Sequence, residues 1–183
     1  SMYGHIRTMA VAIKKGVEAG GGVATLLQVP ETIPPEALAK MGAPPKSDDA
    51  IAKVEDLEGY DGIIFGVPSR FGMPAAQMKT FLDQTGGLWA GGKLIGKPAG
   101  LFISTGSQGG GQETVGLTML TQLTHHGMIY VPLGYRDPKL ADMSEMHGGS
   151  PYGAGTLAGS DGSRQPSKLE TDVAETQGKS FAE

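Results

Sequence analysis

The sequence predicts an α/β protein in which helices cover both faces of a parallel sheet. Two kinds of apolar segment alternate along the 183 residues. Short, almost uncharged runs are typical of buried parallel strands, and longer segments carry apolar residues at helical spacing. This alternation is the pattern of a doubly wound sheet. The length suits one domain and no internal repeat indicates a second, so we expect residues 1–183 to form a single domain.

The expected helices and strands follow in chain order from these patterns. Four apolar runs predict strands, at 23–29, 61–67, 98–104 and 128–133. Helices are expected at 6–17, 36–41, 75–82, 117–127 and 169–181. The first helix stops at the glycines 20–22, and Pro68 is expected to end the second strand.

The segment from Gly134 to Ser167 has no periodic pattern. A loop of this length in a compact domain is usually functional or disordered. Its aromatic and charged residues, Tyr152 and Arg164 among them, favour an ordered and functional segment.

Composition and charge exclude several classes of protein. Fifteen basic and 19 acidic residues give a net charge of -4, which does not favour a nucleic-acid partner. The sequence has no cysteine, so disulfides, thiol catalysis and thiolate metal sites are excluded, and a reducing cytoplasm is favoured. No apolar run is long enough to span a bilayer, although association with a membrane surface stays open.

His125 and His126 are the most conspicuous candidates for a metal site. Adjacent histidines on a helix point about 100° apart, so they cannot readily share one ion. No carboxylate lies at ligand spacing from them. We therefore expect no metal and interpret both as residues of a helix C-terminus.

Polar and glycine-rich loops follow two of the expected strands. These loops are 68–72 and 104–111, and a third, 1–5, directly precedes the first helix. Ligands of open α/β sheets bind at the carboxyl ends of the strands. Hydroxyls, backbone amides and a helix N-terminus form an anion site, and glycines let the backbone approach a flat ring. Together the loops favour a flat, phosphorylated cofactor, although each alone also fits an ordinary surface loop.

Long motifs in these loops and beyond them resemble those of a known family. The motifs lie at 1–5, 65–72, 81–89, 104–113, 125–128, 148–154 and 161–166. In this order they are similar to the WrbA-type NAD(P)H:quinone oxidoreductases, closest to the plant and fungal members. The similarity extends over essentially the whole chain.

The resemblance implies a flavodoxin-like fold with strand order 2-1-3-4-5 and FMN as the cofactor. It further implies NADH or NADPH as electron donor, quinones as small-molecule substrates, ping-pong kinetics, and a homodimer or homotetramer. The flavin supplies the chemistry, so no dedicated acid–base pair is required.

The same resemblance assigns the expected site residues. The phosphate loop would comprise Ser1, Met2, Tyr3, Gly4, His5 and Ile6. The isoalloxazine ring would contact Ser69, Arg70 and Phe71, and its pyrimidine side Ser104, Thr105, Gly106, Ser107, Gln108, Gly109 and Gly110. His125 would reach the flavin, either as a proton donor to the quinone or as a wall of the pocket. Trp89 would line the quinone pocket from a neighbouring subunit, and Tyr3 would also touch the nicotinamide nucleotide.

One departure from the family leaves an alternative function open. The family has an aliphatic strand before the phosphate loop, whereas this sequence begins at Ser1, so we expect an N-terminally truncated domain without its first strand. The alternative is a flavodoxin-fold scaffold or regulatory protein with weak or lost FMN binding. A one-electron carrier is disfavoured, because Trp89 and the 134–167 segment are suited to forming a substrate pocket.

Overall fold

A mostly parallel sheet forms the centre of the computed structural model, which describes residues 2–183. Its main strands are β3 (Ile63–Arg70) and β5 (Pro98–Thr105), which pair in parallel over 63–68 and 99–104. The other side of β5 pairs with β6 (Ile129–Tyr130) at its start and with β7 (Gly155–Leu157) at its end. The short strand β4 (Met73–Pro74) turns back antiparallel onto β3.

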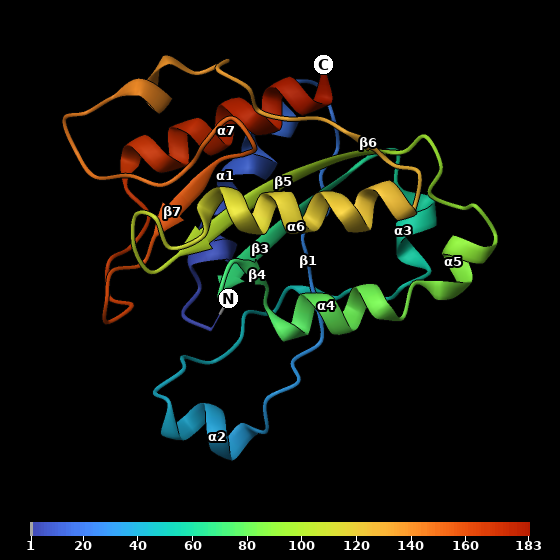
Figure 1. Ribbon diagram of the computed structural model, residues 1–183, viewed down its shortest axis with the longest axis horizontal. Helices are drawn as coiled ribbons and strands as arrows, with labels where there is room; N and C mark the ends of the chain where they lie inside the picture. Colours follow the sequence, from blue (N-terminus) through green and yellow to red (C-terminus); the bar gives the residue numbers. More distant parts are fainter. Residues whose placement is uncertain (1) are drawn as a thin grey trace.

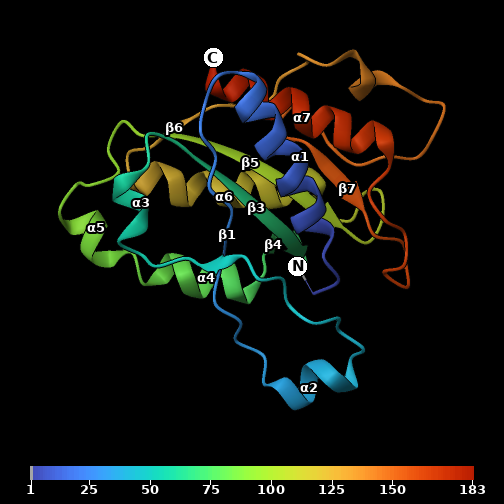
Figure 2. The ribbon, with the colours of Figure 1, turned by 180° about the vertical axis from the view of Figure 1, so that it is seen from behind.

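Helices lie on both faces of this sheet, as the sequence predicts. Figure 1 looks onto the face that α6 (Gln112–His125) covers, and Figure 2 onto the opposite face with α1 (His5–Ala19). Helix α4 (Ala76–Asp83) packs with α6 onto one apolar layer, and α7 (Lys168–Ala182) packs with α1 onto the other. The α/β fold class is therefore confirmed.

The remaining elements lie at the periphery of the sheet. Two strands, β1 (Leu27–Gln28) and β2 (Ala50–Ile51), form a separate parallel pair. The chain between them extends outward to α2 (Pro35–Lys40), which stands apart from both layers in the two views. The short helices are α3 (Asp56–Gly59), α5 (Gly86–Ala90) and the 3₁₀ helix η1 (Pro138–Ala141). No helix among residues 2–183 is both long and apolar enough to cross a membrane.

Strand β5 is buried on both faces because it separates the two apolar layers. Leu101 and Ile103 pack beneath α4 and α6, and Phe102 packs beneath α1 and α7. This explains why the 98–104 run is uncharged. Helices α1 and α7 approach so closely that a Cβ on Gly16 would lie 2.0 Å from the carbonyl oxygen of Glu175.

Three strand predictions were wrong in their extent. The 23–29 run forms a strand only at residues 27–28, because β2, its ladder partner among the described residues, is equally short. The 128–133 run ends as a strand at residue 130, and β7 then takes its place beside β5. Pro68 does not end its strand: β3 continues to Arg70, and it is an edge strand of the parallel sheet, where a proline is tolerated.

The predicted strand order 2-1-3-4-5 is not confirmed. Strand β1, the expected second strand, pairs with no strand of residues 2–183 other than β2. Among the described residues, no strand pairs with residues 63–68 of β3 on the side away from β5.

Candidate functional site

The loops that follow β3 and β5 meet at one edge of the sheet. The two strands are parallel, with Pro68 opposite Ser104, so both loops leave at the carboxyl edge. The hydroxyl of Ser69 donates a hydrogen bond to the carbonyl oxygen of Gly110 (3.4 Å) and accepts one from the Gly72 amide (3.2 Å). A Cβ on Gly111 would lie 2.9 Å from the Cα of Gly72, so only glycine permits this contact.

The start of α1 reaches the same edge. A Cβ on Gly66 would come within 2.6 Å of Cγ2 of Ile6, which places the first turn of α1 directly against β3. Gly4 is the N-cap and has a positive φ of 85°. The remaining phosphate-loop residue at the extreme N-terminus, Ser1, lies outside the described residues. The structure thus brings the three predicted loops together.

The loop after β5 has a buried part and an exposed part. Ser104 and Thr105 are buried, and the Thr105 hydroxyl donates to the carbonyl oxygen of Ser107 at 2.9 Å. Residues 106–110 are exposed. The side chain of Gln112, at the start of α6, donates to the Thr105 hydroxyl oxygen at 2.9 Å and thereby holds the base of the loop. The loop therefore has a fixed base and an accessible rim.

Phe71 combines two unusual properties at this rim. Its side chain is completely exposed, and its backbone has a φ of 55°, the only positive value at a non-glycine residue among residues 2–183. A backbone conformation of this kind costs roughly 1–3 kcal/mol and is concentrated at functional sites. Arg70, the neighbouring residue, is also exposed.

The phosphate loop and the first turn of α1 each contact a distant segment. The hydroxyl of Tyr3 donates to the carbonyl oxygen of Met41 at 3.2 Å, just beyond α2. The guanidinium of Arg7 donates to both carboxylate oxygens of Asp49, at 2.6 and 3.3 Å, and this pairing lowers the pKa of that carboxyl group. Because the Arg7 side chain is more than half exposed, the contribution of this pair to stability is small.

Trp89 and His125 lie at the opposite edge of the sheet. Trp89, in α5, is 59% exposed, and His125 is exposed at the last residue of α6. Strand β5, whose end bears the glycine loop, is eight residues long and spans about 23 Å. One chain therefore does not bring these two side chains to the loops, and their predicted roles require a second copy.

His126 is buried, unlike His125, and connects the end of α6 to the corner between α4 and α5. Its Nε2 lies 2.8 Å from the hydroxyl oxygen of Thr85. That hydroxyl donates its proton to the carbonyl oxygen of Leu82 (2.6 Å), so His126 must be the donor in its own contact. Nδ1 is buried and has no hydrogen-bond partner in the part of the chain that the structure describes. Burial, reinforced by His125, lowers the pKa of His126, so the ring is held neutral.

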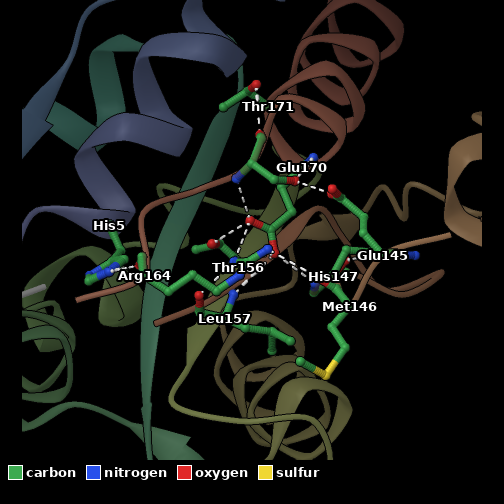
Figure 3. Close-up of polar contacts among 12 residues, drawn as sticks. His5, Glu145, Met146, His147, Thr156, Leu157, Arg164, Glu170 and Thr171 are labelled. Atoms are coloured by element: carbon green, nitrogen blue, oxygen red, sulfur yellow. Dashed lines mark hydrogen bonds and ion pairs between the residues drawn. The ribbon is translucent and has the colours of Figure 1, made fainter. Parts of the chain in front are cut away.

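The sequence did not reveal the most deeply buried ionic group. Glu170, in the first turn of α7, is completely buried and pairs with Arg164 (Figure 3). The two residues fasten the end of the 134–167 segment, because the Glu170 carboxylate also accepts bonds from the amides of Gly148 and Leu157. The spacing Ser167-x-x-Glu170 is that of a capping box, which was the available signal.

The comparisons with known proteins agree with this arrangement. A family model described as NADPH-dependent FMN reductase matches residues 3–136. The chain is 56% identical over 185 residues to the NAD(P)H quinone oxidoreductase PST3 of Candida albicans, covering 100% of this chain and 93% of that protein. It is 58% identical over 184 residues to the quinone-oxidoreductase QR2 of Triphysaria versicolor, covering 100% and 90%.

A solved structure confirms the fold. The crystal structure of the flavodoxin, WrbA-like protein from Agrobacterium tumefaciens has a TM-score of 0.64 at 22% identity, over 100% of this chain and 90% of that one. At this identity the likeness concerns the flavodoxin-like fold alone. The family model and the relatives above confirm the resemblance read from the motifs: the chain belongs to the NADPH-dependent FMN reductase family and, within it, to the WrbA-type NAD(P)H quinone oxidoreductases.

Proposed function

We propose that this chain is an FMN-dependent enzyme that uses NADH or NADPH to reduce quinones to hydroquinones by two electrons. The observation that carries the proposal is the meeting of three loops, 2–6, 69–72 and 104–111, at the carboxyl edge of the sheet. This is where open α/β sheets bind their ligands. The chain's similarity to NAD(P)H quinone oxidoreductases over its full length supports the same reaction.

The residues at this edge fit FMN chemically. The first turn of α1 offers backbone amides at the positive end of a helix, which suits a phosphate. At Gly4 and Gly109 a Cβ would meet no atom of residues 2–183 within 4 Å, so the space above the backbone is open at both loops. The exposed Phe71 supplies an aromatic face, and Ser107 and Gln108 supply polar groups for the rim of a ring.

Bound FMN would accept a hydride from NAD(P)H and pass two electrons to a quinone. The hydride carries two electrons and one proton, so a second proton is needed to complete the hydroquinone. The chain's own part is to hold the ring flat at an open edge where both substrates can stack in turn. We propose His125 either as the donor of the second proton or as a pocket wall, and Trp89 as a wall of the quinone pocket.

We further propose a homodimer or homotetramer in the cytoplasm. Trp89 and His125 can reach the loops only from another copy, since about 23 Å of β5 separates them in one chain. Exposed aromatic side chains at Phe71, Trp89 and Tyr135 support such contacts. The cysteine-free sequence supports a reducing compartment.

The visible spectrum of the purified chain with added FMN tests the proposal. We expect a bound flavin spectrum, and oxidation of NADH or NADPH that depends on added benzoquinone. A chain that remains colourless with FMN, and oxidises neither nucleotide, would instead be a scaffold of the flavodoxin fold.

A further inference from the structure

The carboxylate of Glu170 organises the segment that precedes α7. Its side chain is 0% exposed, and both oxygens accept hydrogen bonds. Five residues supply the donors, at 2.8–3.2 Å: the amides of Gly148, Leu157 and Ser167, the hydroxyl of Thr156 and Nη1 of Arg164. Amide, hydroxyl and guanidinium donors thus satisfy both oxygens of this buried side chain.

Arg164 is fixed both by its side chain and by its backbone. Its guanidinium pairs with Glu170 and also donates to the carbonyl oxygens of Leu157 (2.7 Å) and Met146 (3.0 Å). Its amide donates to the carbonyl oxygen of Ala158 at 2.9 Å. The carbonyl oxygen of Arg164 is therefore held at a defined position.

That carbonyl oxygen accepts a hydrogen bond from His5, the first residue of α1 (Figure 3). The distance from Nε2 is 2.7 Å, and the His5 ring is only 2% exposed. A carbonyl can only accept, so Nε2 carries the proton. The N-cap of α1 is Gly4, which has no side chain for capping the helix. The contact between His5 and Arg164 thus anchors the loop that precedes α1 to a segment 159 residues away in the chain.

We propose that Arg164 and Glu170 are positioning residues for FMN, which act through His5 on the phosphate loop and determine how strongly the protein prefers FMN to riboflavin. The inference rests on the proposed function. We call the contacts of Glu170 with Arg164 and of Arg164 with His5 the clamp. The clamp faces the phosphate loop, whereas the flavin ring is assigned to the loops after β3 and β5. Loosening it should therefore weaken binding of the phosphate and leave binding of the ring unchanged.

The test compares the dissociation constants of FMN and riboflavin, which differ only in the phosphate. We would use fluorescence titration of the full chain for the wild type and three variants. His5→Phe keeps an aromatic ring but removes the donor, and His5→Gln restores a donor at similar reach. The double variant Arg164→Met/Glu170→Gln removes both charges together, because a single change would leave a buried charge unpaired.

A matched control separates positioning from general loss of stability. Thr176→Val removes another hydrogen bond of α7, from the Thr176 hydroxyl to Asp137 Oδ2 (2.6 Å), away from the phosphate loop. It should lower the melting temperature and leave the ratio of the two constants unchanged. His5→Phe and the double variant should raise the FMN constant about tenfold, as expected for one lost hydrogen bond, and the riboflavin constant less than about twofold. His5→Gln should recover most of the preference.

Other outcomes overturn the inference. Equal weakening of FMN and riboflavin, or the same change of ratio in Thr176→Val, would leave the clamp a purely structural feature. If His5→Phe fails to fold, an unchanged ratio in the double variant is sufficient to reject the role. A wild type that reduces quinones with bound FMN but has no preference over riboflavin also contradicts it. A wild type that binds no flavin contradicts the proposed function itself.

Discussion

Single glycines in the loop after β5 differ in what an added side chain would meet. A Cβ on Gly110 would lie 2.8 Å from the carbonyl oxygen of Ser107, so a substitution there would disturb the loop itself. At Gly106 the nearest atom would be 3.7 Å away, an ordinary contact. Gly106→Val is therefore the cleaner test of whether the loop approaches the cofactor.

We expect Gly106→Val to weaken FMN binding about tenfold or more while the melting temperature changes little, because the side chain would occupy space assigned to the flavin. A flavin titration and a thermal melt of the same preparation measure the two effects. Gly59→Val serves as the control, since an added Cβ at Gly59 meets no described atom within 4 Å and Gly59 lies outside the site. An unchanged titration for Gly106→Val would remove the loop from the flavin site.

Trp89 is expected to affect quinone turnover more than flavin binding. Its 59% exposure means that Trp89→Ala removes little from the core. If the indole forms a wall of the quinone pocket, kcat/KM for quinone should fall about tenfold, while the flavin spectrum and its reduction by NADH stay nearly intact. Val23→Ala, which removes another exposed apolar side chain, should leave turnover unchanged. Loss of flavin together with turnover in Trp89→Ala would contradict the assignment.

His126 should make stability depend on pH. Its pKa is lowered in the folded chain, so below about pH 6.5 the unfolded chain binds a proton that the folded chain excludes. The stability that neutral His126 contributes is therefore present above that pH and is lost as the pH falls towards the folded pKa. We expect the difference in unfolding free energy between wild type and His126→Gln to shrink on acidification from pH 8 to pH 5. Denaturant unfolding across this range measures it.

The neighbouring residue provides the control for His126. His125→Gln changes an exposed histidine and should retain most of the pH dependence. A constant difference between wild type and His126→Gln across the range would mean that the buried ring does not respond as its surroundings predict.

At the scale of elements, the contact between α1 and α7 depends on two glycines. A Cβ on Gly16 would lie 2.0 Å from the carbonyl oxygen of Glu175, and one on Gly178 would lie 2.0 Å from that of Ile13. Gly16→Ala or Gly178→Ala should therefore destabilise the fold by about 2–3 kcal/mol, because the helices must separate. In contrast, Gly86→Ala in α5 meets no atom within 4 Å and should be neutral or slightly stabilising. Equal free energies of unfolding for all three variants, measured by chemical denaturation, would contradict this packing.

The sequence predicted the elements whose pattern is local. Helices α1, α4 and α7 and strand β5 were predicted near their observed positions, because apolar spacing alone determines which residues they bury. Helix α6 was predicted to begin at residue 117 but begins at Gln112, because its first turn carries no apolar spacing. Strand β7 was missed: Gly155–Leu157 has no period of its own and is held against β5. A side chain distant in sequence helps to keep β7 beside β5, since Gln177 in α7 donates to the carbonyl oxygen of Leu101 and accepts from the amide of Ala154.

The candidate site was predictable where it depends on local sequence patterns and not where it depends on contacts between distant segments. Two of the three loops follow strands that could be identified, and parallel strands bring their carboxyl ends to one edge. The third loop precedes a helix that could also be identified. The contact of His5 with Arg164 and the burial of Glu170 depend on how the 134–167 segment folds back, which no local pattern specifies. The distance of Trp89 and His125 from the loops likewise follows only from the assembled sheet.

For the whole molecule, the free side of β3 provides a direct test of the flavodoxin-like order. No described strand pairs with residues 63–68 on the side away from β5. We expect a β-branched segment of about six residues, joined before Ser1, to pair there and to raise both the melting temperature and the FMN affinity. The two should rise together because such a strand would lead directly into the phosphate loop. Thermal melts of the 183-residue and extended chains, each with and without FMN, measure this coupling.

The control for this extension is a segment of equal length composed of glycine and serine, which cannot form a stable strand. This control segment should leave both the melting temperature and the FMN affinity unchanged. If the 183-residue chain already binds FMN tightly and gains nothing from the β-branched segment, the expectation that a further strand pairs with β3 is wrong.

Anaerobic mixing of the flavin-loaded chain with substrates tests the central claim most directly. We predict that stoichiometric NADH or NADPH bleaches the flavin absorbance of the bound FMN, and that one equivalent of benzoquinone then restores it with formation of one equivalent of hydroquinone. Each half-reaction should proceed without the other substrate, as ping-pong transfer through one flavin requires. A bound flavin that neither nucleotide bleaches, or that benzoquinone fails to reoxidise, would contradict the assignment as a quinone reductase.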